Sequence, residues 1–253
     1  MNVAIIIPAR FASSRLPGKP LLRETGKYLI QHVYERACAA GCAAEVIVAT
    51  DDDRILTAVR SFGGRAEMTR ADHLSGTDRV AEVAAKLKAE IVVNLQGDEP
   101  LIDPGAIDQL VGLLGRDPGA VMATLAVPIR DRETYFSPNV VKVVCDNRGR
   151  ALYFSRSPIP MVRDGEPDFS KQPPQFHQHL GIYAYRRHFL LELAKTKPHR
   201  LEETEKLEQL RVLALGSAIQ VGTIPHAHRG VDTPEDYTAF VQLTGENVMR
   251  RAA

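Results

Sequence analysis

The stretch VAIIIPARFASSRLPGKP, residues 3–20, decides the fold class of this chain. Its first part, Val3–Ile7, is a short apolar run that is rich in β-branched residues and ends at Pro8. Such a run is typical of a strand that is buried on both faces. Similar runs recur at Glu45–Ala49 and Ile91–Leu95, and apolar residues at helical spacing lie between them. Because alternating strands and helices imply right-handed crossovers, we predict an α/β sandwich with a mainly parallel sheet.

The second half of the chain has more predicted strands and fewer helices between them. Its expected strands are Val140–Val144, Ala151–Phe154, Leu180–Tyr185 and Ala218–Thr223. The Asn-Arg-Gly sequence at 147–149 predicts a hairpin turn between the first two strands. We expect a loop without an assigned role at 164–178, a helix near 202–215 and a last helix from Pro234. The pattern predicts a smaller mixed-sheet subdomain attached to a nucleotide-type α/β core.

Composition excludes several classes of protein. The 253 residues are 44% hydrophobic and 25% charged, which is ordinary globular usage and unlike collagen or disordered chains. The 32 basic and 31 acidic residues leave a net charge of +1, so bulk attraction to nucleic acid is not expected. No apolar window approaches the length of a membrane span, about 18 residues. Three cysteines that lack zinc-ligand spacing fit a reducing cytosol, so we predict a cytoplasmic protein.

The loop after the first strand carries three cations within ten residues: Arg10, Arg15 and Lys19. In open α/β sheets ligands bind beyond the carboxyl ends of the strands, where this loop begins. Arginine forks chelate phosphate oxygens and lysine supplies a point charge, so the loop predicts a polyphosphate site. Ser13 and Ser14 would allow a close approach of backbone amides. The alternative is a solvated basic loop, since neither a Walker sequence nor GxGxxG is present.

Two acidic motifs follow in the sequence. NLQGDEP, residues 94–100, places Asp98 at the end of the third predicted strand, where a carboxylate can hold Mg²⁺ beside phosphates. GVDTPED, residues 230–236, supplies Asp232 as a candidate second ligand. The alternatives are a simple turn for the first motif, and a helix cap by Asp232 or Thr233 for the second.

Other polar motifs are weaker when taken alone. SGTDR, residues 75–79, is either a nucleotide contact or an ordinary helix cap. In the second half, Arg156 is a candidate for gripping a carboxylate and His179 for donating a hydrogen bond to a sugar oxygen. His226 and His228 have no third ligand at zinc spacing, so we do not expect a zinc site there.

Together these motifs resemble the 3-deoxy-manno-octulosonate (Kdo) cytidylyltransferases, also called CMP-Kdo synthetases. The resemblance spans nearly the whole chain, from IIIPARFASSRLPGKPL through NLQGDEP, FSRSPIP, HLGIYAY and LEQLR to GVDTPED. CMP-sialic acid synthetases share the fold but usually differ from this chain at residues 16–20. The resemblance implies a nucleotidyltransferase, Rossmann-like three-layer sandwich in a single domain over residues 1–253. Residues 1–130 would mainly bind nucleotide, 131–230 would bind sugar and dimerise, and 231–253 would form the C-terminal helix.

The family's activity and site residues carry over as expectations. The family joins CTP and Kdo to give CMP-Kdo and pyrophosphate, for lipopolysaccharide synthesis, and generally works as a homodimer. The resemblance implies Mg²⁺ held by Asp98 and Asp232, catalysis by these two with Lys19, and no nucleic-acid or membrane partner. Its implied nucleotide-binding residues are Arg10, Arg15, Lys19, Ser75, Asp78, Arg79 and Gln96. Its implied sugar-binding residues are Arg156, His179, Tyr183, Glu208 and Gln209.

The chemistry predicts a metal-assisted, in-line attack of the anomeric hydroxyl on the α-phosphorus without a covalent enzyme intermediate. Three alternatives stay open at this point. In the first, the chain is a cytidylyltransferase for another acid sugar, such as 8-amino-Kdo or sialic acid. In the second, it binds sugar nucleotides without turnover. In the third, it is an NAD-dependent oxidoreductase. The last is disfavoured because cations stand where a glycine fingerprint is needed.

Overall fold

A computed structural model of the chain describes residues 1–12, 15–227 and 230–252. The chain divides into two compact units, which we call unit 1, Met1–Asp108 with His228–Ala253, and unit 2, Gln109–Ala227. The boundary between the units falls inside a helix that begins at Pro104, whereas the expected division into nucleotide-binding and sugar-binding halves lies at residue 130 and stays a prediction. The C-terminal segment belongs to unit 1. The prediction that both units form one domain stays a prediction.

Unit 1 contains a wholly parallel sheet with the strand order β3-β2-β1-β4. The strands are β1 Val3–Ala9, β2 Glu45–Thr50, β3 Ala66–Met68 and β4 Ile91–Asn94. Strand β1 lies in the middle, where Ile5 pairs with Val46 on one side and Val93 on the other. Its residues are buried on both faces, so the apolar run that predicted this strand is confirmed.

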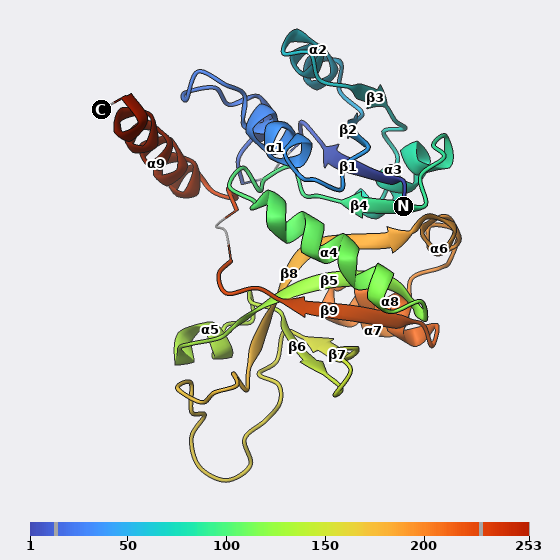
Figure 1. Cartoon of the computed structure of the whole chain (residues 1–253), viewed down its shortest axis with the longest axis vertical. Coiled ribbons are helices and arrows are strands. Elements are labelled where there is room, and N and C mark those ends of the chain that lie inside the picture. The colour runs from blue at the N-terminus through green and yellow to red at the C-terminus, as the bar shows by residue number, and fades with distance from the viewer. Residues whose placement is uncertain (13–14, 228–229, 253) are drawn as a thin grey trace. The chain divides into compact units, whose positions relative to one another are not determined.

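The described part of unit 1 also contains five helices and a short 3₁₀ turn (Figure 1). They are η1 Lys19–Leu21, α1 Leu29–Cys38, α2 Asp53–Ser61, α3 Gly76–Ala85, α9 Pro234–Ala252, and α4 Pro104–Arg116, which continues into unit 2. The apolar stripe of α1 is buried as its helical spacing predicts. Helix α9 joins unit 1 because Tyr237 and Phe240 pack in one cluster with Leu29 of α1. No helix among the described residues is long and apolar enough to cross a membrane.

Unit 2 is built on a mixed sheet, in which β5 pairs antiparallel with β8 and parallel with β9 (Figure 1). Strands β6 and β7 form an antiparallel hairpin at 145–151, as the sequence predicts. The strands are β5 Ala120–Pro128, β6 Lys142–Cys145, β7 Ala151–Ser155, β8 His177–Arg186 and β9 Ala218–Thr223. The helices are α5 Arg132–Phe136, α6 Arg187–Leu193, α7 Arg200–Glu205 and α8 Gln209–Ala214. The predicted α/β fold with parallel and mixed strands is confirmed.

The helix expected near 202–215 is two helices, and the prediction of one is wrong. Lys206 ends α7 in a left-handed conformation, with φ of 56°. The two helices are held by a buried ion pair, in which Arg211 donates to both carboxylate oxygens of Glu202 at 2.5 and 2.7 Å. Arg211 also donates to the carbonyl oxygens of Leu193 and Thr196. Because the helix breaks at Lys206, two of the predicted sugar-binding residues, Glu208 and Gln209, stand at the start of α8.

We expect the variant Arg211→Met to lower the free energy of unfolding by about 3–5 kcal/mol, because it leaves the Glu202 carboxylate buried without its cation. Urea titration monitored by circular dichroism measures this change. The double variant Arg211→Met with Glu202→Leu removes the stranded charge and should recover most of the loss. Equal stability of the single variant and the wild type would contradict the role given to this pair.

Candidate active site

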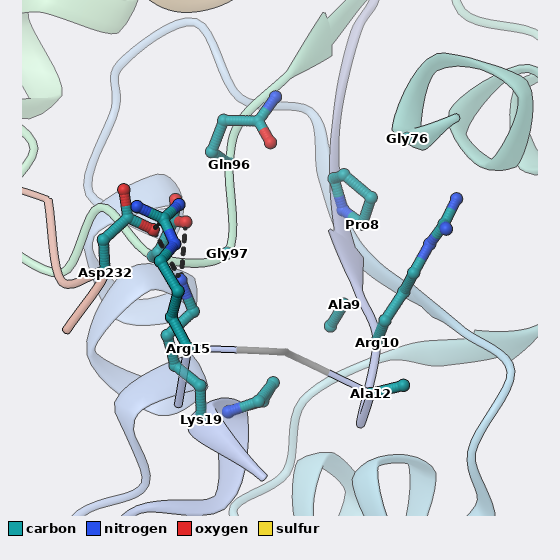
Figure 2. Close-up of a pocket in the computed structure, with 12 residues that line it drawn as sticks. Pro8, Ala9, Arg10, Ala12, Arg15, Lys19, Gly76, Gln96, Gly97 and Asp232 are labelled. Atoms are coloured by element: carbon teal, nitrogen blue, oxygen red, sulfur yellow. Dashed lines mark hydrogen bonds and ion pairs between the residues drawn. The ribbon is translucent and has the colours of Figure 1, made fainter. Parts of the chain in front are cut away.

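A cavity of about 380 Å³ opens in unit 1, where residues of four of the predicted motifs meet. In the order β3-β2-β1-β4 the chain builds outward from β1 in one direction and then places β4 on its other side. The gap between the ends of β1 and β4 is therefore a topological switch point, where open α/β sheets bind ligands. The cavity is lined by Pro8, Ala9, Arg10, Ala12, Arg15, Lys19, Pro20, Gly76, Gln96, Gly97, Asp98 and Asp232 (Figure 2).

Lys19 joins the two predicted metal carboxylates. Its Nζ lies 2.8 Å from Oδ2 of Asp98 and 3.2 Å from Oδ1 of Asp232, and it also donates to the carbonyl oxygen of Val231 at 2.9 Å (Figure 2). The Lys19 side chain is only 13% exposed, whereas that of Asp232 is 46% exposed. Arg15, whose side chain is 65% exposed, also contacts the Asp232 carboxylate, with its Nη2 at 3.2 Å from Oδ1. The contacts bring both carboxylates to one cation at the cavity wall.

The cap of α9 is formed by Thr233 and not by Asp232. Thr233 Oγ1 accepts from the backbone N–H of Asp236, and an Asp236 carboxylate oxygen accepts from the N–H groups of Thr233 and Asp232. This reciprocal arrangement is a capping box. Capping therefore explains the Thr-Pro-Glu-Asp sequence and leaves the Asp232 carboxylate to the cations of the cavity.

Glu99 adds a third carboxyl group to this corner, and the sequence analysis gave it no role. Burial is the largest influence on its pKa, followed by the negative charges of Asp98 and Asp232, and together they raise the pKa to about 8. Lys19 acts in the opposite direction. Adjacency to Asp98 in the motif was the available signal for Glu99, but it did not reveal that this side chain is partly buried.

The loop between β1 and η1 is closed by its backbone. The N–H of Gly18 donates to the carbonyl oxygen of Phe11 at 3.2 Å, and Gly18 has a φ of +68° that favours glycine. The Arg10 side chain extends toward Gly76 and away from Asp232 (Figure 2). Its Nη2 donates to the carbonyl oxygen of His73 at 3.1 Å. Gln96 lines the cavity, as its predicted contact with the nucleotide requires. Ser13, Ser14 and His228 lie outside the described residues.

The motif at 75–79 divides between a cap, a cavity wall and the core. Ser75 Oγ accepts from the N–H of Asp78, and Asp78 Oδ2 accepts from the N–H of Ser75, so both side chains cap α3. Gly76 lines the cavity. Arg79 was expected to bind nucleotide directly. Its side chain is instead 0% exposed and lies in the core. Its guanidinium donates to Asp51 Oδ2 at 2.6 Å and to Thr69 Oγ1.

Four of the predicted sugar-binding residues gather in unit 2 around Tyr183. The Tyr183 hydroxyl donates to Oε1 of Gln209 at 3.3 Å, and its ring centroid lies 5.5 Å from that of His179. Burial, and then the charge of Glu208, raise the pKa of Tyr183. Gln209 is 2% exposed, and its Nε2 has no hydrogen-bond partner among the described residues. A buried donor without a partner is costly, which makes this cluster a candidate ligand site.

The contacts of Arg156 run to other residues of unit 2. Its Nε donates to the carbonyl oxygen of Glu205 at 2.8 Å, and its backbone N–H donates to the Glu205 carboxylate at 2.9 Å. The buried ammonium of Lys142 donates to the carbonyl oxygen of Arg156 at 2.6 Å and to those of Ser137 and Val140. The turn that carries Arg156 is thus fixed by two charged groups that the sequence analysis did not identify.

The chain is similar to known cytidylyltransferases along most of its length. A family model described as cytidylyltransferase matches residues 4–219. The 3-deoxy-manno-octulosonate cytidylyltransferase of Geobacter sulfurreducens is 54% identical over 241 residues, which cover 93% of this chain and 96% of the relative. The protein of the same name from Syntrophobacter fumaroxidans is 54% identical and covers 98% of this chain and 99% of its own length.

Solved structures give the same result. A CMP:2-keto-3-deoxy-manno-octonic acid synthetase complexed with CTP is 46% identical, with a TM-score of 0.91, and covers 98% of this chain and 100% of the solved one. Sequence and structure agree over nearly the full length of the chain, and the family's motifs line the cavity between β1 and β4. The chain therefore belongs to the cytidylyltransferase family and groups with its 3-deoxy-manno-octulosonate members.

Proposed function

We propose that this chain transfers CMP from CTP to the anomeric hydroxyl of Kdo, giving CMP-Kdo and pyrophosphate. The observation that carries the proposal is the cavity of unit 1, which Arg10, Arg15 and Lys19 line together with Asp98 and Asp232. Lys19 contacts both carboxylates and Arg15 contacts that of Asp232. A cavity that combines several cations with a pair of convergent carboxylates suits a metal-bound triphosphate. The similarity to a synthetase solved with CTP supports this choice of nucleotide.

The reaction joins two anions, so the site has to compensate charge and orient the reactants. The oxygen of the anomeric hydroxyl forms a bond to the α-phosphorus, the bond from that phosphorus to the pyrophosphate oxygen breaks, and the hydroxyl proton is released. Arg10 and Arg15 can hold the phosphate oxygens through their N–H groups, and Lys19 supplies positive charge at the cavity wall. No side chain needs to act as a nucleophile, because the sugar hydroxyl attacks the phosphorus itself.

The donor set fits a magnesium ion. Mg²⁺ prefers one or two carboxylates together with substrate phosphates, and the Asp98 and Asp232 carboxylates converge on the ammonium of Lys19. We propose that these two side chains hold Mg²⁺. When bound, the ion would supply charge neutralisation at the phosphates and would lower the pKa of the attacking hydroxyl. Glu99 and Lys19 would tune the charge of the same corner.

We propose that unit 2 binds the sugar. Buried His179 and Gln209, with half-buried Tyr183 and Glu208, offer hydrogen-bonding groups, and Arg156 offers a guanidinium for the sugar carboxylate. We further propose a cytoplasmic homodimer that serves lipopolysaccharide synthesis. The free cysteines fit a reducing compartment, and the names of the relatives support the sugar.

The test is pyrophosphate release by the purified chain with Kdo and CTP, compared with ATP, GTP and UTP. We expect release that needs CTP, Kdo and Mg²⁺ together and that stops when EDTA removes the ion, because the phosphates then lose their counter-charge. Excess Mg²⁺ added after EDTA should restore it. Pyrophosphate release with 8-amino-Kdo or sialic acid, but not with Kdo, would show that the substrate is that other acid sugar. No release with any of these sugars would favour a non-catalytic binding protein.

A further inference from the structure

We call His179, Tyr183, Glu208 and Gln209 the Tyr183 cluster. Thr124 contacts this cluster through His179, and the sequence analysis gave it no role. It belongs to β5 and is fully buried. The pairing of β5 with β8 shifts register at Thr124, where β8 forms a bulge at 181–182 between His179 and Tyr183. Bulges re-aim side chains and are common beside active sites. The bulge turns two carbonyl groups of β8 toward the Thr124 hydroxyl.

The hydroxyl of Thr124 faces three partners. Its Oγ1 lies 2.8 Å from the carbonyl oxygen of Ile182, 3.1 Å from that of Leu180 and 3.0 Å from Nε2 of His179. A hydroxyl carries one proton and two lone pairs, and carbonyl oxygens only accept. The nearest of the three partners is the carbonyl oxygen of Ile182, so we assign the single proton to that contact. Oγ1 then has no second proton to donate, and in the hydrogen bond with His179 the donor is Nε2.

The protonation of the second ring nitrogen follows from burial. His179 is 7% exposed, and burial lowers its pKa to about 3. The ring is therefore neutral near pH 7 and carries a single N–H group. With that group at Nε2, Nδ1 holds a lone pair and acts as an acceptor. A histidine in this state would accept a hydrogen bond at Nδ1, whereas the sequence-based expectation is that His179 donates to a sugar oxygen.

We propose that Thr124 is a positioning residue that fixes His179 as the Nε2–H tautomer, so that Nδ1 accepts a hydrogen bond from a hydroxyl group of the sugar. The inference rests on the proposed function of unit 2 for its ligand. An acceptor at Nδ1 repels a carboxylate, so the Tyr183 cluster takes a hydroxylated part of the acid sugar. Gln209 supplies the complementary donor, because its buried Nε2 lacks a partner among the described residues. A hydroxyl group can donate to the first and accept from the second.

The tautomer can be read directly by NMR of the full chain labelled with ¹⁵N at histidine. The His179 signals are assigned by their loss in His179→Gln. We expect Nε2 to resonate as an N–H nitrogen and Nδ1 as an unprotonated one at pH 7.5. A spectrum in which Nδ1 carries the proton, or in which both nitrogens do, would overturn the proposal. This result does not depend on the identity of the sugar or on turnover.

Two variants separate positioning from packing. Thr124→Val keeps the shape and loses the hydroxyl, whereas Thr124→Ser keeps the hydroxyl and loses a methyl group. We expect Thr124→Val to lose the single tautomer and to raise KM for Kdo about tenfold, with KM for CTP within about twofold of wild type. Thr124→Ser should keep the tautomer and both KM values. Equal KM values for Kdo in Thr124→Val and the wild type, with the tautomer intact, would contradict the proposal.

The controls keep the failures distinguishable. Circular dichroism verifies that each variant folds, and if Thr124→Val does not fold, the wild-type spectrum and Thr124→Ser still decide the assignment. A wild-type chain that shows the Nε2–H tautomer but releases no pyrophosphate with Kdo would contradict Kdo as the substrate and leave the tautomer assignment intact. An active enzyme with the proton at Nδ1 would contradict only the positioning role of Thr124.

Discussion

Replacing Asp98 with asparagine is expected to lower kcat for pyrophosphate release at least about 100-fold, while the variant stays folded. The change keeps the size of the side chain and removes one of the two carboxylates that contact Lys19 Nζ. Mg²⁺ loses a charged ligand at the point where phosphate charge has to be compensated. The measurement is kcat at saturating CTP and Kdo, with the concentration of Mg²⁺ varied.

Asp103→Asn is the matched control for this prediction. Asp103 is an exposed carboxylate of unit 1 that accepts from the N–H of Gly105 through Oδ1, and asparagine retains that acceptor. This variant should keep kcat within about twofold of wild type, as surface changes away from a site usually do. A kcat for Asp98→Asn equal to that of the control would remove Asp98 from the reaction. Recovery of the rate at high Mg²⁺ would instead identify a weakened metal site.

The variant Lys19→Met is expected to lower kcat/KM for CTP by about 10²–10³-fold, because the cavity loses a cation that is only 13% exposed. Lys19 contacts Asp98, Asp232 and the carbonyl oxygen of Val231, so its loss also leaves two carboxylates without this shared partner. Their repulsion then opposes the approach of the triphosphate. Steady-state kinetics with CTP varied at fixed Kdo measures the effect.

The conservative change at this position is informative as well. Lys19→Arg keeps the charge but replaces a compact ammonium by a planar fork, so we expect an intermediate loss. Lys27→Met is the control, since Lys27 is exposed in the same unit and pairs with Glu35 on the surface. It should behave as wild type. A value of kcat/KM for Lys19→Met close to that of Lys27→Met would show that triphosphate binding does not need Lys19.

The sequence by itself determined the parallel core and the position of its loops. Val3–Ile7 and Ile91–Leu95 could be identified as buried strands because burial on both faces leaves a local, continuous apolar run. Once such strands alternate with helices, the loops that follow them meet at one edge of the sheet. The location of Arg10 and Asp98 beside one cavity was therefore predictable from the sequence pattern. The family resemblance added the identity of the nucleotide and sugar as expectations.

Only the tertiary structure decided which polar groups meet. Lys19 reaches Asp98 and Asp232 across 79 and 213 residues, and no local pattern encodes such a contact. Arg79 has the same appearance in the sequence as a cation that binds phosphate, yet it is buried against Asp51. Thr124 is one more residue of an apolar strand until the bulge of β8 turns two carbonyl groups toward it. The physical reason is that periodicity records local burial, whereas hydrogen bonding depends on strand register and on segments that are far apart in the chain.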